Sequence, residues 1–310
     1  MGVGQTLTVT TAMQSPGDPM SDLLGKTMLI TGANTGIGRA TALALGARGA
    51  TLFLAGRSEE KTRPVVEEVR ASGGRATYLP LDLGDLDSVK ACAASFLSDP
   101  DRPLHVLLNN AGLAGSTGLT RQGFELTFGV NHLGHFLLTE LLLGRLKASA
   151  PARIVNVASK AHYKSPALDL EVLQTGAKTH QVMTRYRVSK LCNVLHAKDL
   201  ASRLVGSGVQ TYSVHPGVVA SDVWRSVPRP LAWLAKPFMI TNEQGAATSL
   251  YCAASPACSD QTGLYYDKNQ DETPSTQAQD AALAEQLRAR CAAWVAPWLP
   301  EAPGPTEASA

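Results

Sequence analysis

The sequence TMLITGANTGIG, residues 27–38, decides the fold of this 310-residue chain. It opens with a short apolar run, continues into a turn with three glycines, and is followed by an amphipathic stretch to about Arg48. A strand, a glycine-rich turn and a helix in this order place a phosphate at a helix N-terminus. Glycine lets the backbone approach a pyrophosphate that any Cβ would push away. The spacing G-x-x-x-G-x-G differs from the commoner G-x-G-x-x-G. Its position between a strand and a helix nevertheless predicts a dinucleotide-binding turn.

The composition is that of a soluble globular protein and excludes several other classes. Hydrophobic residues make up 44% of the chain and charged residues 17%, which is not the composition of a disordered chain. The net charge of +2 gives no reason to expect a nucleic-acid partner. Five cysteines without C-x-x-C spacing argue against structural zinc and a disulfide framework, so a reducing, cytoplasmic location fits. No run of eighteen apolar residues exists, so we expect no membrane-spanning helix.

One folded domain is expected between two poorly structured ends. Residues 1–22 are rich in Thr, Gly, Ser and Pro and lack the basic start and apolar core of a signal peptide, so they are interpreted as a flexible leader. Either Met1 or Met20 could be the true start. Residues 297–310 are rich in Pro, Ala and Glu, and are predicted to be a disordered tail. The folded domain is then residues 23–296.

Strands alternate with helices throughout this domain. The apolar runs predict strands at 27–30, 51–55, 76–80, 104–108, 153–157, 209–214 and 264–265. The longer patterns predict helices after residue 38 and at 59–71, 86–97, 121–147, 186–205, 243–254 and 276–293. This alternation is typical of right-handed parallel crossovers. It predicts a single Rossmann-like, doubly wound α/β domain, with about seven parallel strands and helices on both faces of the sheet.

The end of the second predicted strand bears on cofactor choice. In dinucleotide-binding sheets an acid at this point holds the ribose 2′-hydroxyl of NAD, whereas an arginine accommodates the 2′-phosphate of NADP. Residues 55–57 contain no acid and end in Arg57. We therefore predict that NADP(H) is preferred, with Arg39 as a second contact and NAD(H) as the alternative cofactor. The alternative interpretation is that Arg57 is a solvated arginine at a strand end.

Further polar residues follow the next strands. Asp82 is placed to meet an adenine edge, and Asn109 is placed to brace the loops, although an asparagine in a turn needs no ligand. Asn131 falls in the middle of a helical pattern, where its side-chain amide should have a partner. His132 and His135 lie three apart without a third metal ligand nearby, so we interpret them as structural and predict no metal site.

Tyr186 and Lys190 lie four apart on one predicted helix, and therefore on one face of it. A tyrosine normally titrates near pH ~10 and a lysine near ~10.4. An ammonium fixed beside the ring should lower the pKa of the tyrosine, because it favours the phenolate. Such a tyrosine could exchange a proton near neutral pH. Alone, the pair is equally typical of an aromatic ring packed beside a lysine stem.

Several motifs in order resemble the short-chain dehydrogenase/reductase family over residues 25–265. They are Thr31-Gly32-x-x-x-Gly36-x-Gly38, Asp82, Asn109-Asn110-Ala111-Gly112, Asn131, Ser159, Tyr186-x-x-x-Lys190 and Pro216-Gly217. Within the family, the stretches TGANTGIGR (31–39), VNHLGHF (130–136) and RIVNVAS-x-AH (153–162) are similar to the retinol-dehydrogenase-like group, as is the long spacing between Ser159 and Tyr186. Ala158 replaces a frequent serine. The vertebrate retinol enzymes often carry an N-terminal membrane anchor, which we do not expect here.

The resemblance implies hydride transfer between a nicotinamide cofactor and an alcohol or carbonyl group. It implies that Tyr186 is the general acid/base, that Lys190 lowers the tyrosine pKa and holds the nicotinamide ribose, and that Ser159 donates to the substrate oxygen. Asn131 would fix a water that passes protons towards Lys190. Together with the cofactor-choice argument above, it gives a set of predicted cofactor contacts: Gly32, Asn34, Thr35, Gly36, Ile37, Gly38, Arg39, Arg57, Asp82, Leu83, Asn109, Ala111, Gly112, Tyr186, Lys190, Pro216, Gly217, Val219 and Ser221.

Residues 222–242 are apolar and punctuated by proline, as expected of a lid over a hydrophobic substrate. The apolar residues are Trp224, Leu231, Trp233, Leu234 and Phe238, of which Trp224, Trp233 and Phe238 are the predicted substrate contacts. The segment could instead pack on its own core or rest on a membrane surface. A homo-oligomer is compatible with the sequence. Two other functions stay open: a reductase of carbon–carbon double bonds, and a redox-inactive scaffold that keeps the fold.

Overall fold

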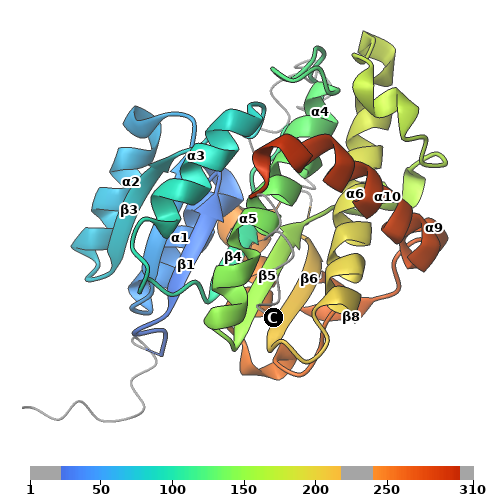
Figure 1. Cartoon of the computed structure of the whole chain (residues 1–310). Helices are drawn as coiled ribbons and strands as arrows, with labels where there is room; N and C mark the ends of the chain where they lie inside the picture. Colours follow the sequence, from blue (N-terminus) through green and yellow to red (C-terminus); the bar gives the residue numbers. More distant parts are fainter. Residues whose placement is uncertain (1–21, 218–239, 301–310) are drawn as a thin grey trace, which may run out of the picture.

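The computed structural model describes residues 22–217 and 240–300, and within these ranges one eight-stranded sheet forms the centre of the molecule (Figure 1). Its strand order is β3-β2-β1-β4-β5-β6-β7-β8. The strands are β1 Thr27–Thr31, β2 Thr51–Gly56, β3 Arg75–Pro80, β4 Val106–Asn109, β5 Ala152–Val157, β6 Val209–His215, β7 Leu264–Asp267 and β8 Gln270–Glu272. The first seven strands are parallel, which confirms the predicted doubly wound α/β fold.

The eighth strand, β8, pairs with β7 in antiparallel orientation and was not expected from the sequence. The two residues that join them, Lys268 and Asn269, both have positive φ, at 51° and 65°. Positive φ at both central positions is what a tight hairpin requires, and glycine usually supplies it. Because no glycine marks this turn, the hairpin left little signal in the sequence.

Helices cover both faces of the sheet. They are α1 Gly36–Ala47, α2 Glu59–Ala71, α3 Leu86–Leu97, α4 Leu126–Phe128, α5 Gly134–Ala148, α6 Val182–Arg203, α8 Asn242–Ala254, α9 Thr276–Gln279 and α10 Ala281–Val295. Buried side chains of α1, α2 and α8 share one hydrophobic cluster, and those of α3, α5, α6 and α10 share the other. Successive residues of β1 point alternately into the two clusters: Leu29 into one, Met28 and Ile30 into the other. The strands are therefore apolar on both sides.

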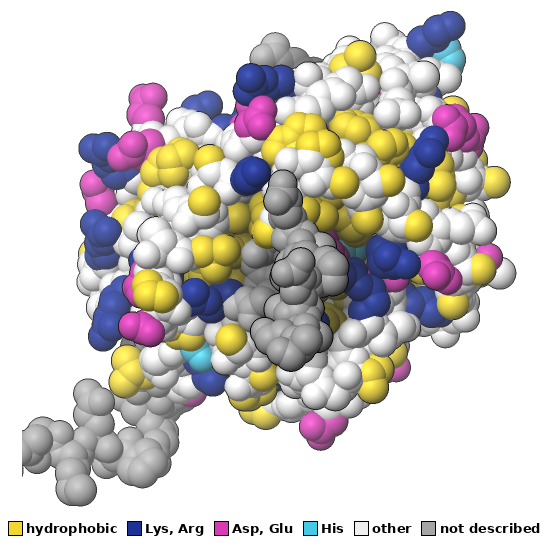
Figure 2. Space-filling model, viewed as in Figure 1, with side chains coloured by type: hydrophobic (Ala, Val, Ile, Leu, Met, Phe, Trp, Pro, Cys, Tyr) yellow, Lys and Arg dark blue, Asp and Glu magenta, His cyan; other side chains and the backbone are white. Residues whose placement is uncertain are grey.

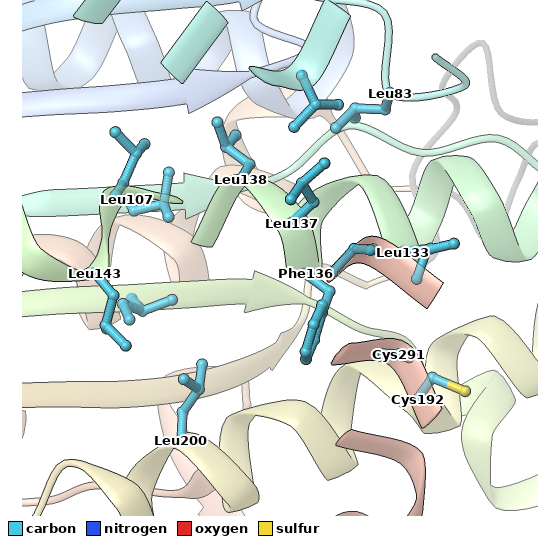
Figure 3. Packing of buried hydrophobic residues seen from close by; sticks show 14 of the residues in the cluster. Leu83, Leu107, Leu133, Phe136, Leu137, Leu138, Leu143, Cys192, Leu200 and Cys291 are labelled. Atoms are coloured by element: carbon cyan, nitrogen blue, oxygen red, sulfur yellow. The ribbon is translucent and has the colours of Figure 1, made fainter. Parts of the chain in front are cut away.

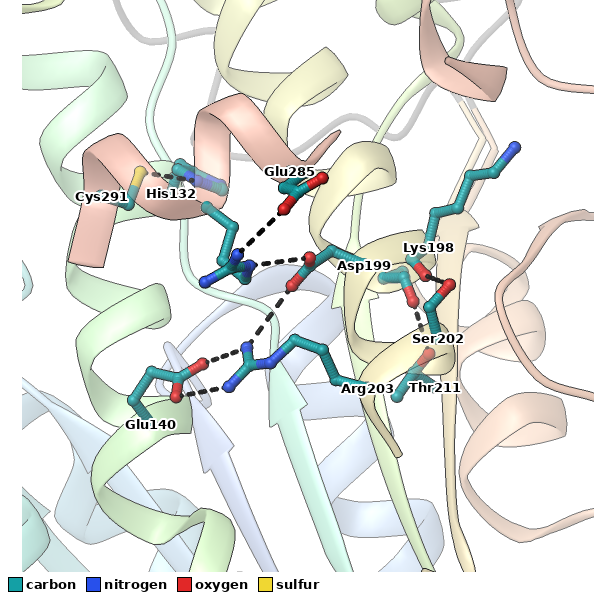
Figure 4. Close-up of polar contacts among 11 residues, drawn as sticks. His132, Glu140, Lys198, Asp199, Ser202, Arg203, Thr211, Glu285 and Cys291 are labelled. Carbon is teal, nitrogen blue, oxygen red and sulfur yellow. Dashed lines mark hydrogen bonds and ion pairs between the residues drawn. The ribbon is translucent and has the colours of Figure 1, made fainter. Parts of the chain in front are cut away.

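The cluster around α5 forms the interior on one side of the sheet (Figure 3). Phe136, Leu137 and Leu138 of α5 are fully buried in it with Leu107 of β4 and Leu200 of α6. On the outside, Arg203 of α6 forms ion pairs with Glu140 of α5 at 2.6 Å and with Asp199 at 3.4 Å (Figure 4). Asp199 also pairs with Arg288 of α10 at 3.2 Å. These ion pairs link α5, α6 and α10 on the outer side of the apolar interior.

Two predicted helices differ from the structure. The pattern over residues 121–147 begins as a helix only at Leu126 and passes through a wide π-helical turn, Gly129–Leu133, before α5. The pattern over 276–293 is divided at Asp280, whose carboxylate accepts the N–H of Leu283 and so caps α10. Both differences are local changes of backbone geometry within the predicted ranges.

The predicted leader and most of the predicted tail lie outside the described residues, so the division into leader, domain and tail stays a prediction. The first residues assigned to the tail are described, and they include the 3-10 turn Ala296–Trp298. The indole Nε1 of Trp298 donates to Asp87 of α3 at 2.7 Å. Helical structure therefore continues past residue 296. Exposed large hydrophobic side chains in the described ranges, such as Leu24 and Val205, are scattered, and charged side chains are common on the face shown in Figure 2.

Candidate active site

The glycine-rich turn between β1 and α1 packs closely against the loop after β4. A Cβ on Gly38 would lie 2.3 Å from the carbonyl oxygen of Gly32 and 2.4 Å from Nδ2 of Asn110. Gly32 has φ +67°, and a Cβ there would lie 2.9 Å from Ala111. Glycine is thus required by the protein's own close packing at these two positions, as well as by the approach of a phosphate that the sequence suggested.

Asn110 and Thr31 hold the two loops together, and neither was assigned a role from the sequence. The side-chain amide of Asn110 donates to the carbonyl oxygens of Thr31 at 2.8 Å and of Gly32 at 3.2 Å. In return, Thr31 Oγ1 accepts the backbone N–H groups of Asn110 and Ala111, both at 3.0 Å. Thr31 Oγ1 also lies 2.8 Å from Nε2 of His135. The NNAG sequence marked this loop, but nothing in it distinguished Asn110 from Asn109.

Asn109, the predicted brace, points into the interior instead. Its side-chain amide donates to Thr139 Oγ1 at 3.1 Å and to Asn156 Oδ1 at 2.9 Å, so it joins β4 to α5 and β5. Only 2% of the residue is exposed. The bracing of the glycine turn is therefore corrected to Asn110. A cofactor contact of Asn109 stays a prediction that would involve its backbone.

The N-terminus of α1 fits an anionic ligand. Helix α1 has no side-chain cap hydrogen bond and no acid in its first turn, as is also true of α5 and α6, but α1 alone of these three follows the glycine-rich turn. The first N–H groups of a helix lack intrahelical acceptors, and the helix dipole is positive there. A pyrophosphate would supply the missing acceptors. The residues at this end thus fit a dinucleotide, including the predicted contacts Asn34, Thr35 and Ile37.

The two arginines predicted at the cofactor differ in their surroundings. Arg57 is exposed at the end of β2 and forms no hydrogen bond or ion pair with the residues that the structure describes. Arg39 is paired with Glu68 of α2. A phosphate at the end of β2 would therefore find the Arg57 guanidinium unengaged, but would compete with Glu68 for Arg39.

Asp82 and Leu83 follow β3, as predicted. Asp82 Oδ1 accepts the N–H of Gly84 at 2.9 Å, and the backbone N–H of Asp82 donates to Ser88 Oγ at 2.9 Å. Leu83 is buried, and its carbonyl oxygen would lie 2.5 Å from a Cβ on Gly134. The turn is thus fixed by its own hydrogen bonds and by α5. The predicted contacts of both residues with an adenine stay predictions.

The structure brings Ser159, Tyr186 and Lys190 together beyond the C-terminal end of β5. Ser159 follows β5, while Tyr186 and Lys190 lie one turn apart near the start of α6. The Ser159 side chain lies close enough to the Tyr186 hydroxyl to favour the phenolate. Lys190 Nζ lies 5.7 Å from the centroid of the Tyr186 ring and donates to the carbonyl oxygen of Val157 at 2.8 Å. Residues 27 positions apart in sequence thus form one polar group.

The pKa of Tyr186 is shifted in the direction opposite to the one expected. Burial raises the pKa of Tyr186, because it disfavours the phenolate, and the hydrogen bond with Ser159 only partly offsets this. Burial also lowers the pKa of Lys190 to about 8. The expectation that Lys190 lowers the tyrosine pKa is therefore not met in this structure, where burial dominates the shift. The ammonium donates to the Val157 carbonyl instead.

Asn131 lies in the π-helical turn and is fully buried. Its Oδ1 accepts the N–H of Leu113 at 2.8 Å, and its Nδ2 donates to the Leu113 carbonyl at 2.9 Å and to Ser189 Oγ at 3.0 Å. These contacts supply the partner that the sequence required. A Cβ on Gly112 would lie 3.3 Å from Asn131 Oδ1 and 3.6 Å from Lys190 Nζ, so the loop after β4 meets both residues here.

His132 and His135 have partners within the protein. His132 Nδ1 lies 3.1 Å from Asn193 Oδ1, and its Nε2 lies 3.6 Å from Cys291 Sγ (Figure 4). His135 lies between Thr31 and the Asn131 carbonyl. Burial lowers the pKa of His132 to about 4 and that of His135 to about 3, so both are neutral near pH 7. In residues 22–217 and 240–300, no group of three His, Cys, Asp or Glu residues could hold a metal ion.

The remaining predicted contacts lie after β6. Pro216 and Gly217 are described, and Gly217 has φ +85°, with Ile240 packed 2.4 Å from where a Cβ would lie. Val219, Ser221 and the apolar lid residues Trp224, Leu231, Trp233, Leu234 and Phe238 lie outside the described residues.

A glycine-rich turn before α1 and a Ser/Tyr/Lys group at the C-terminal edge of a parallel sheet fit a dinucleotide-dependent oxidoreductase. Residues 26–170 match the family model described as short chain dehydrogenase. Retinol dehydrogenase 11 of Homo sapiens is 45% identical over 270 residues, which cover 86% of this chain and 84% of that protein. The chain belongs to the short-chain dehydrogenase/reductase family and to its retinol-dehydrogenase-like group. It is an NAD(P)-dependent enzyme that acts on alcohol or carbonyl groups.

Solved structures agree with this assignment. An uncharacterized protein from Mycobacterium Paratuberculosis superimposes with a TM-score of 0.71 at 32% identity, covering 89% of this chain and 96% of that one. A protein from Beutenbergia cavernae, provisionally named an NAD(P) dependent gluconate 5-dehydrogenase, has bound NADP. It gives a TM-score of 0.66 at 25% identity, covering 81% of this chain and 97% of that one. None of the helices described in the present structure has both the length and the apolarity needed to cross a bilayer.

We expect Lys190→Met to stabilise the fold at pH 7 by roughly 1–3 kcal/mol while removing activity. The pKa of Lys190 falls from 10.5 to about 8 on folding, so the buried cation costs up to ~3 kcal/mol at about 1.4 kcal/mol per pKa unit. The lost hydrogen bond returns only ~1 kcal/mol of this, and Asn193 still donates to the Val157 carbonyl at 3.0 Å. Urea unfolding of the two proteins at pH 7 and at pH 10 measures the difference.

The sign of the pH dependence is fixed by the direction of this shift. Below pH 8 both folded and unfolded Lys190 are charged, and the folded protein carries the full penalty of burial. As the pH rises from 8 towards 10.5, folded Lys190 is neutral before unfolded Lys190, so the wild type gains stability. The advantage of the variant should therefore shrink at pH 10. Lys198→Met, on the outer side of the same helix, is the control, and an equal effect of both substitutions would contradict the argument.

Proposed function

We propose that this protein is an NADP(H)-dependent oxidoreductase that transfers a hydride between the nicotinamide and a hydrophobic alcohol or carbonyl compound. The observation that carries the proposal is the meeting of Ser159, Tyr186 and Lys190 beyond β5. Nothing about folding requires a buried lysine beside a serine–tyrosine pair, since a buried cation lowers stability. A redox-inactive scaffold would gain nothing from keeping it.

Each side chain has a distinct task in carbonyl reduction. The nicotinamide, when bound, supplies the hydride to the carbonyl carbon. Tyr186 gives its phenolic proton to the substrate oxygen, and Ser159, whose side chain lies beside the Tyr186 hydroxyl, donates a hydrogen bond to the same substrate oxygen as negative charge develops. Lys190, with a pKa of about 8, is largely protonated near pH 7 and is proposed to hold the nicotinamide ribose. Asn131 is proposed to hold a proton-carrying water beside Lys190.

A hydrophobic substrate is supported by the names of the relatives, which are retinol dehydrogenases. The apolar residues Trp224, Trp233 and Phe238 are proposed to contact it. The second candidate reaction is reduction of a carbon–carbon double bond, because a tyrosine and a lysine in this arrangement can also protonate carbon. The cytoplasmic location and the oligomeric state stay predictions.

Oxidation of NADPH in the presence of a carbonyl panel tests the function. The panel should contain long-chain aldehydes, lipophilic ketones, conjugated enones, and small charged or sugar-like carbonyls. We expect turnover with the lipophilic members and an allylic alcohol from each enone. A saturated ketone would identify the double-bond reductase. Turnover confined to the charged or sugar-like members would contradict the hydrophobic substrate, and no turnover with any member or with the matching alcohols would favour the scaffold.

We expect NADPH to bind at least about tenfold more tightly than NADH, and Arg57→Ala to remove most of this preference. Hydrogen bonds to a charged group contribute about 1.5–3 kcal/mol, and ~1.4 kcal/mol corresponds to tenfold in Kd. The guanidinium of Arg57 is exposed and unengaged among the described residues, so a 2′-phosphate can bind it without breaking an ion pair. Fluorescence titration of both cofactors gives the four dissociation constants.

Two arginines provide the matched comparisons for this titration. Arg75 is also exposed, but it is the first residue of β3 and so lies at the N-terminal ends of the parallel strands, away from Arg57. Arg75→Ala should therefore leave the preference unchanged. Arg39→Ala should have a smaller effect than Arg57→Ala, because Glu68 already engages Arg39. Equal affinities for the two cofactors in the wild type, or an unchanged ratio of the two dissociation constants in Arg57→Ala, would mean that Arg57 is only a solvated residue at a strand end.

A further inference from the structure

His162 is a fully buried histidine three residues after Ser159, in the 3-10 turn Lys160–Lys164. Both of its ring nitrogens have protein partners. Nδ1 lies 2.7 Å from the carbonyl oxygen of Ser159, and Nε2 lies 3.2 Å from the backbone nitrogen of Ser275. The ring therefore connects the proposed oxyanion donor to a residue more than a hundred positions later in the chain.

The two partners determine where the imidazole proton is. A carbonyl oxygen can only accept, so Nδ1 must carry the hydrogen that faces Ser159. A backbone N–H can only donate, so Nε2 must present its lone pair to Ser275. The ring is thus held as the neutral Nδ1–H tautomer. Burial lowers the pKa of His162 and favours the same neutral form.

The contact with His162 fixes the peptide of Ser159. The Ser159 carbonyl accepts two hydrogen bonds from the same residue, one from the backbone N–H of His162 at 3.1 Å and one from the ring. The next side chain makes a parallel link, because the Tyr163 hydroxyl donates to the Thr273 carbonyl at 2.6 Å. The chain from 159 to 163 is therefore tied at two points to the segment that leads into α9.

We propose that His162 is a positioning residue for Ser159, which orients the serine hydroxyl towards Tyr186 and couples it to the segment before α9. The inference rests on the proposed function, because it assumes that Ser159 donates to the substrate oxygen. A misplaced donor loses its effect on the transition state while the cofactor site is unchanged. The effect should therefore be on kcat, with little change in NADPH affinity.

Two substitutions at His162 separate its two contacts. In His162→Asn, the amide nitrogen replaces Nδ1 and can still donate to the Ser159 carbonyl, but the side chain is too short to reach Ser275. In His162→Gln, the amide oxygen replaces Nε2 and can still accept from Ser275, but no donor lies at the Nδ1 position. We expect kcat of His162→Asn to stay within about threefold of the wild-type value and kcat of His162→Gln to fall by about tenfold. The difference between the two variants corresponds to the loss of one hydrogen bond to the Ser159 carbonyl. Equal kcat values in both variants and the wild type would overturn the proposal, as would the reverse order.

A second pair, at Ser275, tests the coupling without touching the histidine. Ser275 has φ −57°, which proline adopts without strain, and its side chain caps α9 by accepting the N–H of Ala278. Both Ser275→Ala and Ser275→Pro lose this cap, but only the proline also removes the N–H that donates to Nε2. We expect kcat of Ser275→Pro to be about two- to threefold below that of Ser275→Ala, within the loss allowed for His162→Asn, which breaks the same contact. The ring nitrogen signals of His162 in a long-range ¹H–¹⁵N spectrum should change from the single Nδ1–H tautomer only in the proline variant.

The benchmark variants Ser159→Ala and Tyr186→Phe separate the failure of this inference from failure of the proposed function. If Ser159→Ala is fully active, Ser159 is not the donor, and the proposed function loses that residue together with the inference. If Ser159→Ala is inactive while His162→Gln and Ser275→Pro have normal kcat, only the positioning role of His162 is overturned. If the His162 variants do not fold, the Ser275 pair decides, and equal kcat with an unchanged ring spectrum overturns the proposal.

Discussion

Tyr186→Phe should lower kcat by about 10²–10⁴-fold, the usual contribution of a positioned general acid/base, while the Kd of NADPH stays within about threefold. The substitution removes only the hydroxyl beside Ser159, and the ring continues to fill the same space beside Lys190. The phenol acts on the substrate oxygen, so its loss affects the chemical step and leaves cofactor binding nearly unchanged. Single-turnover oxidation of bound NADPH, together with a fluorescence titration, measures both quantities.

Tyr251→Phe is the control for loss of a tyrosine hydroxyl. Tyr251 lies on α8, which packs on the other face of the sheet from Tyr186, so the Tyr251→Phe variant should retain wild-type kcat. A Tyr186→Phe enzyme with near-normal kcat would remove Tyr186 from the mechanism.

The pH dependence of the wild-type reaction is a second test of the role of Tyr186. Because burial raises the pKa of Tyr186, the phenol is the neutral-pH form. Carbonyl reduction should persist through neutral pH and decline only in alkali, whereas alcohol oxidation, which needs the phenolate, should rise with pH.

Gly38→Ala should weaken NADPH binding by about ten- to a hundredfold and lower the melting temperature. The added Cβ would lie 2.3 Å from the Gly32 carbonyl oxygen and 2.4 Å from Asn110 Nδ2, which is well inside van der Waals contact. Both neighbours are held by hydrogen bonds, because the Asn110 amide donates to Thr31 and to Gly32 itself. The glycine turn must move away from the loop after β4, at a cost of about 1–3 kcal/mol typical of overpacking. The turn that moves is the one proposed to hold the pyrophosphate.

Gly144→Ala provides the matched control. Gly144 is also a helical glycine, in α5, but no heavy atom lies within 4 Å of the position of its Cβ. Alanine is favoured over glycine inside a helix by about 1 kcal/mol, so this variant should be slightly more stable and bind NADPH normally. Unchanged cofactor affinity in Gly38→Ala would mean that the turn is not the pyrophosphate site. Equal loss of affinity in both variants would mean that the effect is not local.

The positions of several site residues were decided by packing that no local pattern records. The sequence NNAG shows two asparagines after a strand, but only the arrangement of β1, β4 and β5 determines that Asn110 faces the glycine turn while Asn109 faces the interior. His162 stood in the sequence beside Ser159 without a recognisable role. Its second partner, Ser275, is brought to it by the crossing of the chain back to β7 and α9. A contact between two residues so far apart in the sequence cannot be predicted from the spacing of residues within a motif.

The sequence by itself determined the doubly wound fold and the glycine turn, because these depend on hydrophobic period and glycine placement, which are local properties of the chain. Helical spacing paired Tyr186 with Lys190, whereas Ser159 and Asn131 came from the resemblance to the family, and the roles of all four stay predictions. Only the tertiary structure decided the electrostatics. Tyr186 and Lys190 are four apart in any helix, and an exposed pair would lower the tyrosine pKa. Here Lys190 is buried and Tyr186 is half-buried, and Lys190 donates to the Val157 carbonyl. The sign of a pKa shift is set by the balance of desolvation against charge, and burial is a property of the whole fold.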